Sequence, residues 1–213
     1  MASKKKPARE VAQIRSDEVW IDHAEIGDAD AEWLGGVEWL TLWNVTVPQG
    51  FLAGLPKLWA VDWRGGSASD LAILDGCTRL RGLVVNQVRG LRDLSLLGSL
   101  TSLEFLSIYG LKQVESAPSL QALTRLQRLE VGMMRGLERI GPLLEAPAIE
   151  ELYLHKWVNV TTDDVERLKH HPTLRSFDWW GVEVPSSRWI PVLEAVGLPK
   201  ANPVMPRDWF GAG

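Results

Sequence analysis

The chain has 213 residues, of which 46% are hydrophobic and 23% charged, with a formal net charge of -4. This composition excludes disorder along most of the chain, and the slightly negative charge gives no basic field that would attract nucleic acid. No apolar run approaches the roughly 20 residues of a membrane-spanning helix, so we expect no membrane contact. The 11 tryptophans, against 2 tyrosines and 4 phenylalanines, are the unusual feature.

Residues 1–15 are predicted to form a flexible basic arm. They include the lysine run Lys4–Lys6, which is typical of a solvated chain end. No apolar stretch of signal-peptide length follows the lysines, so we expect no secretory signal. Cys77 is the single cysteine, which rules out a disulfide within the chain and fits a reducing compartment. These features predict a cytoplasmic protein.

Residues 16–185 contain about eight copies of one apolar pattern, L-x-x-L-x-L, which begin at 16, 37, 58, 80, 103, 126, 149 and 174. The first, fourth and sixth positions are apolar, as in a short strand with one buried face. After each strand the apolar spacing becomes three, as at Val88, Leu91 and Leu94, which favours a 3₁₀ turn or a tight return arm. One such unit cannot bury its own apolar edge, so neighbouring units are predicted to stack into a solenoid with a continuous core.

The last repeats and residues 186–213 are predicted to close the stack. Thr161–Asp164 supply hydroxyl and carboxylate groups suited to a helix start. Ser186 opens a second short helix that ends at Gly197. The residues that follow are rich in Pro and Gly, so we expect an irregular tail whose Trp209 and Phe210 fold back onto the last repeat.

The repeats resemble leucine-rich repeats, and LRDLSLLGSLTSLEFLSI at 91–108 is especially similar to the short bacterial, internalin-type version. The resemblance implies an α/β fold: a right-handed solenoid with a parallel sheet on its concave face and mostly 3₁₀ or irregular structure on its convex side. Stand-alone bacterial proteins of this kind include regulators, immunity-type inhibitors and effectors, and the residues leave these three roles open. The family usually carries Asn at the ninth position of the repeat. This chain has there Ala24, Val45, Gly66, Val88, Leu111, Met134, Trp157 and Val182.

The third, fifth and seventh positions of each repeat point away from the core, onto the concave face of the predicted sheet. They carry many aromatic side chains, which dominate the energetics of protein interfaces. These positions also hold six acids against two arginines, which predicts a partner protein with a basic surface patch. The predicted partner-binding residues are Trp20, Trp39, Trp43, Asp62, Arg64, Phe105, Tyr109, Arg128, Glu130, Glu151, Tyr153, His155, Asp178 and Trp180.

Other uses of the same face stay open at this stage. Aromatic rings paired across strands also stabilise a sheet without binding anything. Tryptophans beside carboxylates suit a glycan or another small ligand, although a shallow face is a poor pocket. The face could also hold a second copy of the chain, which would make the protein a self-associating scaffold. The favoured interpretation is a monomer that binds another protein.

No catalytic chemistry is predicted. The four histidines, among them His170 and His171, lack the spacing of zinc ligands. His155 is the best functional candidate as a polar contact on the concave face, but no nucleophile or oxyanion donor accompanies it. We therefore expect no enzyme activity, no metal and no cofactor.

Overall fold

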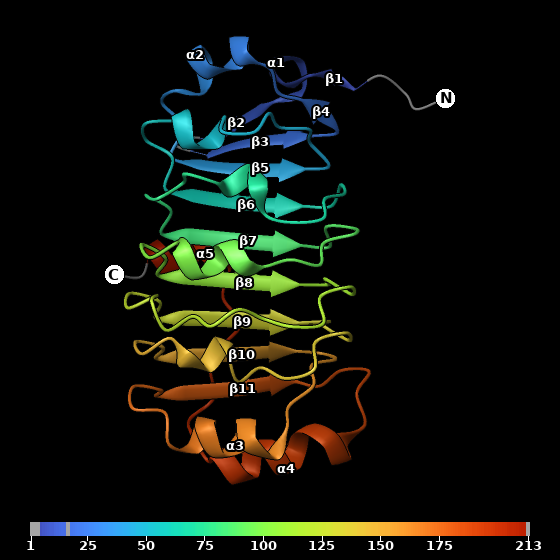
Figure 1. Ribbon diagram of the computed structural model, residues 1–213, viewed down its shortest axis with the longest axis vertical. Helices are drawn as coiled ribbons and strands as arrows, with labels where there is room; N and C mark the ends of the chain where they lie inside the picture. Colours follow the sequence, from blue (N-terminus) through green and yellow to red (C-terminus); the bar gives the residue numbers. More distant parts are fainter. Residues whose placement is uncertain (1–4, 16–17, 212–213) are drawn as a thin grey trace.

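The computed structural model describes residues 5–15 and 18–211, and most of them belong to a tall stack of coils with one strand per coil (Figure 1). The main sheet of this part of the chain has nine strands, in the order β11-β10-β9-β8-β7-β6-β5-β3-β2. Each strand pairs in parallel with its counterpart in the next repeat, as Trp43 does with Arg64, whereas β2 is antiparallel to β3. The predicted register is confirmed. The strands are β2 (Gln13–Arg15), β3 (Glu18–Asp22), β5 (Trp39–Trp43), β6 (Ala60–Arg64), β7 (Gly82–Asn86), β8 (Phe105–Tyr109), β9 (Arg128–Gly132), β10 (Glu151–His155) and β11 (Ser176–Trp180).

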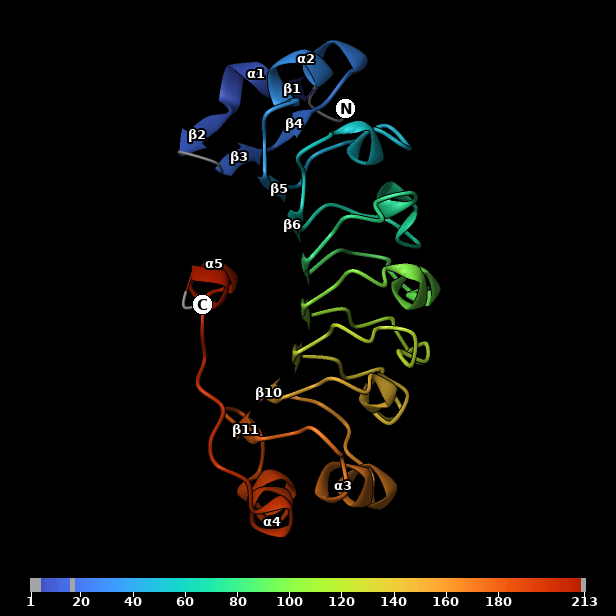
Figure 2. The same cartoon turned by 90° about the vertical axis from the view of Figure 1, so that its left-hand side faces the viewer.

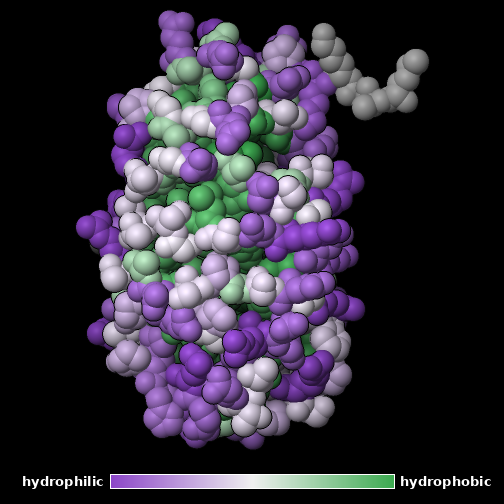
Figure 3. All heavy atoms as spheres, in the orientation of Figure 1, coloured by the Kyte–Doolittle hydropathy of each residue, from purple (hydrophilic) through white to green (hydrophobic). Residues whose placement is uncertain are grey.

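Short 3₁₀ helices line the convex side, as the spacing of three predicts. The core lies between them and the sheet, where inward-facing residues such as Leu40, Leu42 and Leu106 are fully buried. Hydrophilic residues cover most of the convex surface, and apolar residues show in smaller areas between them (Figure 3). The convex elements are η1 (Asp28–Asp30), α2 (Ala31–Leu34), η2 (Leu52–Gly54), η3 (Ala72–Leu74), η4 (Ser95–Ser99) and η5 (Leu143–Glu145).

The corner after each strand is held by the main chain. The eighth residue of seven successive repeats adopts a left-handed conformation, with φ of 54° at Gln87 and 51° at Met133. Its N–H donates to the carbonyl that ends the next strand, as from Gln87 to Tyr109 at 2.8 Å and from Met133 to His155 at 3.1 Å. The ninth residue is apolar and buried in most of these repeats, as at Leu111. Main-chain bonds and an apolar column therefore form the corner without the Asn of the family pattern.

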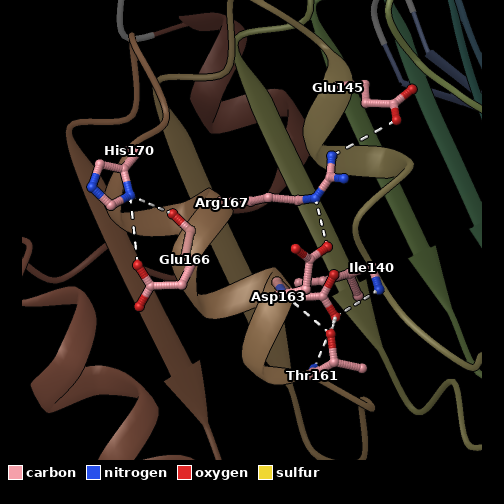
Figure 4. A network of polar contacts seen from close by, with 8 residues as sticks. Ile140, Glu145, Thr161, Asp163, Glu166, Arg167 and His170 are labelled. Atoms are coloured by element: carbon pink, nitrogen blue, oxygen red, sulfur yellow. Dashed lines mark hydrogen bonds and ion pairs between the residues drawn. The ribbon is translucent and has the colours of Figure 1, made fainter.

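Helices α3 (Thr162–Lys169) and α4 (Ser186–Val196) close the C-terminal end of the stack, and both predicted starts are confirmed. Asp164 N–H donates to the Thr161 hydroxyl at 3.2 Å, and the Asp164 carboxylate accepts from Thr161 N–H at 2.9 Å. Figure 4 shows this start together with Arg167, which pairs with Asp163 at 2.9 Å and reaches Glu145 of the preceding repeat. These contacts tie α3 to the solenoid.

The expectation of a flexible arm is wrong for residues 5–15, which form an N-terminal cap. β1 (Lys6–Pro7) pairs with β4 (Ala24–Glu25), α1 (Ala8–Val11) follows it, and β2 extends the main sheet. Ala8 is fully buried. A solenoid end needs such a cover because its first repeat exposes core residues. Residues 1–4, and Ser16 as the start of the first repeat, lie outside the described residues.

Residues 198–211, called here the C-terminal segment, cross the concave side. The segment leaves α4, and its Pro199 carbonyl accepts a hydrogen bond from Phe177 N–H in β11 at 2.9 Å. It then runs along the open side of the sheet to the short helix α5 (Pro206–Gly211), which lies opposite the middle strands (Figure 2). The prediction that the tail folds onto the last repeat is therefore wrong, because its aromatic residues pack several strands away.

Candidate functional site

The middle of the concave face is an aromatic cluster that the C-terminal segment completes. The Phe210 ring lies 4.8 Å from Trp59 and 6.2 Å from Trp39, in edge-to-face contacts, and Trp209 lies 5.8 Å from Phe105. Gly82 leaves room for this packing, since a Cβ atom there would come within 2.9 Å of the Phe210 ring. Two rings from the end of the chain thus fill a hollow formed by β5 to β8.

This cover corrects the predicted exposure of several site residues. Trp39 is only 6% exposed, and Phe105 and Tyr153 are also buried. Their strand parity is as predicted, so they do point away from the solenoid core. They are buried because the concave face itself has become a second packed layer. Trp39 and Phe105 in particular lie beneath the rings of the C-terminal segment.

A buried ion network occupies the same face next to the aromatic cluster. Arg128 is fully buried, donates to Glu130 at 2.7 Å and also pairs with Glu151. It donates in addition to the main-chain carbonyl of Asn202, at 2.7 Å, and so fastens the C-terminal segment to β9. Burial raises the pKa of the Glu130 carboxyl, and the Arg128 charge opposes that rise. The expectation that Arg128 and Glu130 are exposed contacts is wrong.

Most of the acids on this face have cationic partners within the chain. Asp62 is buried and pairs with Arg64 at 2.6 Å, and burial raises the pKa of its carboxyl against the opposing effect of Arg64. Glu18 pairs with Arg207 of the C-terminal segment at 3.0 Å. Together with Glu130 and Glu151, which share Arg128, four of the six acids have an arginine partner within the chain. Only Arg207 is added to the two arginines that the sequence places on this face, so six acids face three arginines and part of the acid excess remains.

The accessible part of the predicted site is the row at the carboxyl ends of the strands. Trp43 is 42% exposed and Trp180 is 48% exposed. Among the described residues, these two are the tryptophans that count as exposed. Trp43 lies 6.0 Å from Trp20, whose ring is also covered by the Arg64 guanidinium at 5.7 Å. We call this row the exposed edge. It consists of Trp43, Arg64, Tyr109, His155 and Trp180, which end their strands, and of Trp20, whose ring lies beside Trp43.

His155 lies between aromatic rings on β10, near the C-terminal end of the exposed edge. Its imidazole is 4.4 Å from Tyr153, 6.0 Å from Tyr109 and 6.3 Å from Trp180, all nearly perpendicular. Gly132 leaves room for the His155 side chain, since a Cβ atom at Gly132 would lie 2.5 Å from the His155 Cβ. Burial first, and the nearby charge of Arg128 second, lower the pKa of His155 to about 4. The imidazole is therefore a neutral polar contact at pH 7.

We expect an NMR titration of His155 to give a pKa near 4, well below the ordinary value of 6.5. Between these two values the unfolded chain binds a proton that the folded chain does not, so folding stability falls as the pH drops through this window. Urea unfolding at pH 7.5 and pH 5 should show a smaller difference for His155→Gln than for the wild type. A midpoint near 6.5 for the imidazole in the folded protein would contradict this packing.

Several residues of the concave site were missed by the sequence analysis. Trp59 and Arg81 occupy the second position of their repeats, just before the strand, and the Arg81 guanidinium stacks over Trp59 at 5.4 Å and over Phe210 at 5.5 Å. The consecutive aromatic pair Trp209–Phe210 within a Pro-rich tail was the available signal for a packed segment. No repeat pattern indicated which strands it would contact.

The described residues contain no group of three or more side chains suited to holding a metal ion, and none of their helices has the length and apolar character needed to span a membrane. Cys77 is buried, and burial raises the pKa of its thiol to about 11. A thiol of this kind is a poor nucleophile because little thiolate forms near neutral pH. Cys77 therefore serves as a small apolar filler.

The molecule is thus a leucine-rich-repeat solenoid. No family model and no curated protein matches its sequence. Its fold is similar to that of internalin C2 from Listeria monocytogenes, with a TM-score of 0.54 and 19% identity, covering 76% of this chain and 80% of that one. Another internalin of the same organism, inlF, gives a TM-score of 0.30 and 18% identity, covering 87% and 73%. At this level of identity the first similarity establishes the fold alone, and it confirms the predicted internalin-type architecture.

Proposed function

We propose that this protein is a non-enzymatic module that holds a partner protein along the exposed edge of its concave sheet. The observation that carries the proposal is the pair of solvent-exposed rings, Trp43 and Trp180, at equivalent positions of β5 and β11. Six strand steps of about 4.8 Å separate them, which corresponds to roughly 29 Å. Such a span suits a folded protein surface better than a small ligand.

The residues between these two tryptophans support a polypeptide partner. Tyr109 and His155 are half-buried rings that present polar atoms at the same edge. Interface hot spots are typically aromatic or arginine side chains that are partly packed before the partner arrives. Leucine-rich-repeat folds of the internalin type are generally protein-binding and non-catalytic, which agrees with the burial of Cys77 and the neutral His155.

The test is affinity capture from a lysate with the wild type and with a Trp43→Ala/Trp180→Ala variant, followed by mass spectrometry and measurement of binding to the captured partner. We expect the double variant to bind more weakly by at least about 2 kcal/mol, or roughly 30-fold. Ile190→Ala is the matched control, because Ile190 is an exposed apolar residue on α4, away from the sheet. Unchanged affinity in the double variant would sink the proposal.

A cytoplasmic location remains part of this proposal. It rests on the lone Cys77, which forms no disulfide and is buried as a free thiol. Fractionation of the source cells with an antibody against the folded protein tests it, and recovery outside the cytoplasm would overturn it.

A further inference from the structure

We infer that the concave hollow between β5 and β8 is a binding groove for a short polypeptide carrying two adjacent aromatic residues, and that the C-terminal segment is its internal ligand. This rests on the proposed function only in that the partner is taken to be a polypeptide. A partner segment of the same chemistry would displace the C-terminal segment and occupy the groove. The exposed edge and the groove would then form one continuous interface.

The groove is built for aromatic rings. Trp39, Trp59 and Phe105 surround the Phe210 and Trp209 rings at centroid distances of 4.8–6.2 Å. Such edge-to-face pairs contribute about 0.5–1.5 kcal/mol beyond the burial of their surface. Without its ligand the groove would expose Trp39 and Phe105, which are now at most 6% exposed. Apolar patches of this kind on a folded surface mark interaction sites.

The aromatic end of the C-terminal segment is less buried than the groove that it fills. The helix α5 has no buried residue, and Trp209 and Phe210 are only half-buried. Residues 198–205, which connect α4 to α5, form no helix or strand, and Met205 is 61% exposed. The groove is formed by strands of the main sheet, whereas its present occupant is a short segment tethered to α4.

The polar contacts of the segment indicate which chemical groups of a ligand the groove would recognise. Arg128 donates to a main-chain carbonyl, that of Asn202, which any peptide could supply. Glu18 pairs with Arg207, two residues before the aromatic pair. The groove thus favours a ligand with a basic residue shortly before two aromatics, and with an extended stretch upstream that offers a carbonyl to Arg128.

The space beside the segment leaves room for a longer ligand. A pocket of about 550 Å³ lies between the segment and the amino ends of the middle strands. It is lined by charged groups of both signs, including Arg81, Glu104 and Glu150 just before their strands and Lys200 and Asp208 on the segment. A partner segment that also reaches these groups would gain contacts that the internal one lacks.

The tether sets how strongly an external ligand must bind. Residues 198–205 connect α5 to α4, and a short linker of this kind holds its end near a binding site at an effective concentration in the millimolar range. An external peptide can bind only molecules whose groove is open. Its apparent association constant is therefore the intrinsic constant multiplied by the fraction of open molecules. A partner that also contacts the exposed edge gains the additional energy needed to open the groove.

The experiment measures binding of a fluorescent peptide with the sequence of residues 199–211 to full-length proteins. The Trp209→Ala/Phe210→Ala variant removes the internal rings, and we expect it to bind the peptide at least tenfold more tightly than the wild type. Adding Gly82→Val to the Trp209→Ala/Phe210→Ala variant should weaken its peptide binding at least tenfold, because the valine side chain would occupy the Phe210 position. Gly82→Ala replaces it if the larger variant does not fold. The control peptide carries alanine at both aromatic positions and should not bind.

A second readout uses the wild type and does not depend on any variant. Saturating peptide should increase hydrogen exchange of the amides in α5, because the displaced segment becomes solvated. Equal peptide affinity for the wild type and the Trp209→Ala/Phe210→Ala variant, together with unchanged exchange in α5, would show that the segment is a fixed cover. A dimer seen by light scattering that the variant loses would show that the occupant is a second copy. Either result overturns the inference, while capture through Trp43 and Trp180 tests the proposed function separately.

Discussion

Replacing Arg128 by Met is expected to lower the free energy of unfolding by about 3–5 kcal/mol, because it leaves Glu130 buried without its cation. Arg128 is fully buried and bridges Glu130, Glu151 and the Asn202 carbonyl. Removing it therefore breaks the ion network and also releases the middle of the C-terminal segment. Urea unfolding followed by circular dichroism measures the loss.

The pH dependence of this variant provides an internal check. Burial already raises the pKa of Glu130, and without Arg128 the pKa should rise further. The folded variant then binds a proton at a pH where the unfolded carboxyl is ionised, so its stability should increase as the pH falls through the raised pKa. The destabilisation by Arg128→Met should accordingly be larger at pH 8 than at pH 5.

Two further variants separate the buried charge from a general effect of losing an arginine. Arg128→Met/Glu130→Gln removes the stranded carboxylate and should be more stable than Arg128→Met alone. Arg175→Met breaks an exposed pair with Glu150, 3.6 Å apart, and should cost less than about 1 kcal/mol. If all three variants unfolded at the same urea concentration, the network would not be the source of the stability.

Trp39→Ala and Trp43→Ala should separate stability from binding, although the two residues lie on the same strand and the same face. Trp39 is packed between Trp59 and Phe210, and its truncation should cost about 3–5 kcal/mol. For a chain of this size that corresponds to a decrease of roughly 6–20 °C in melting temperature. Trp43 contacts mainly Trp20, and its truncation should cost less than about 1 kcal/mol.

The same pair should also differ in the capture experiment. Trp43→Ala removes an exposed ring and should weaken partner binding while the protein stays folded. Trp39→Ala should lower the melting temperature, and any effect on partner binding should come from the groove that Trp39 lines and not from the exposed edge. Thermal unfolding by circular dichroism measures one effect and partner affinity the other. A large melting shift for Trp43→Ala would show that its ring supports the fold and is not available to a partner.

The register of the sheet could be predicted from the sequence. Side chains along a strand point alternately into the core and onto the concave face, and the same alternation occurs in each repeat. Leu40 and Leu42 are therefore inside and Trp39 and Trp43 outside the core, as expected. The two helix starts could be predicted because capping depends on nearby side chains such as Thr161. These are local relations, and they determine most of the solenoid.

The cover of the concave face could not be predicted in the same way. The contact between Gly82 and Phe210 joins residues far apart in a chain whose last segment has no periodic pattern. Arg128 was expected to be exposed, since arginines are seldom fully buried unless paired. Of its partners, the Asn202 carbonyl belongs to the C-terminal segment, so its burial depends on a contact that the repeat pattern does not contain. The burial of Ala8, which shows that the N-terminal cap is packed, could not be predicted either, because the lysine run before it is typical of a solvated chain end.

The position of the C-terminal segment has a consequence for synthesis on the ribosome. Phe105 leaves the ribosome about 100 residues before Phe210, which corresponds to roughly 5–20 s at ordinary elongation rates. Strands β5 to β8 can stack during this interval, because each repeat depends only on its neighbours. The nascent solenoid therefore presents Trp39 and Phe105 to its surroundings before the last residues can shield them, so a chaperone or a partner can reach an open face that the finished molecule keeps closed.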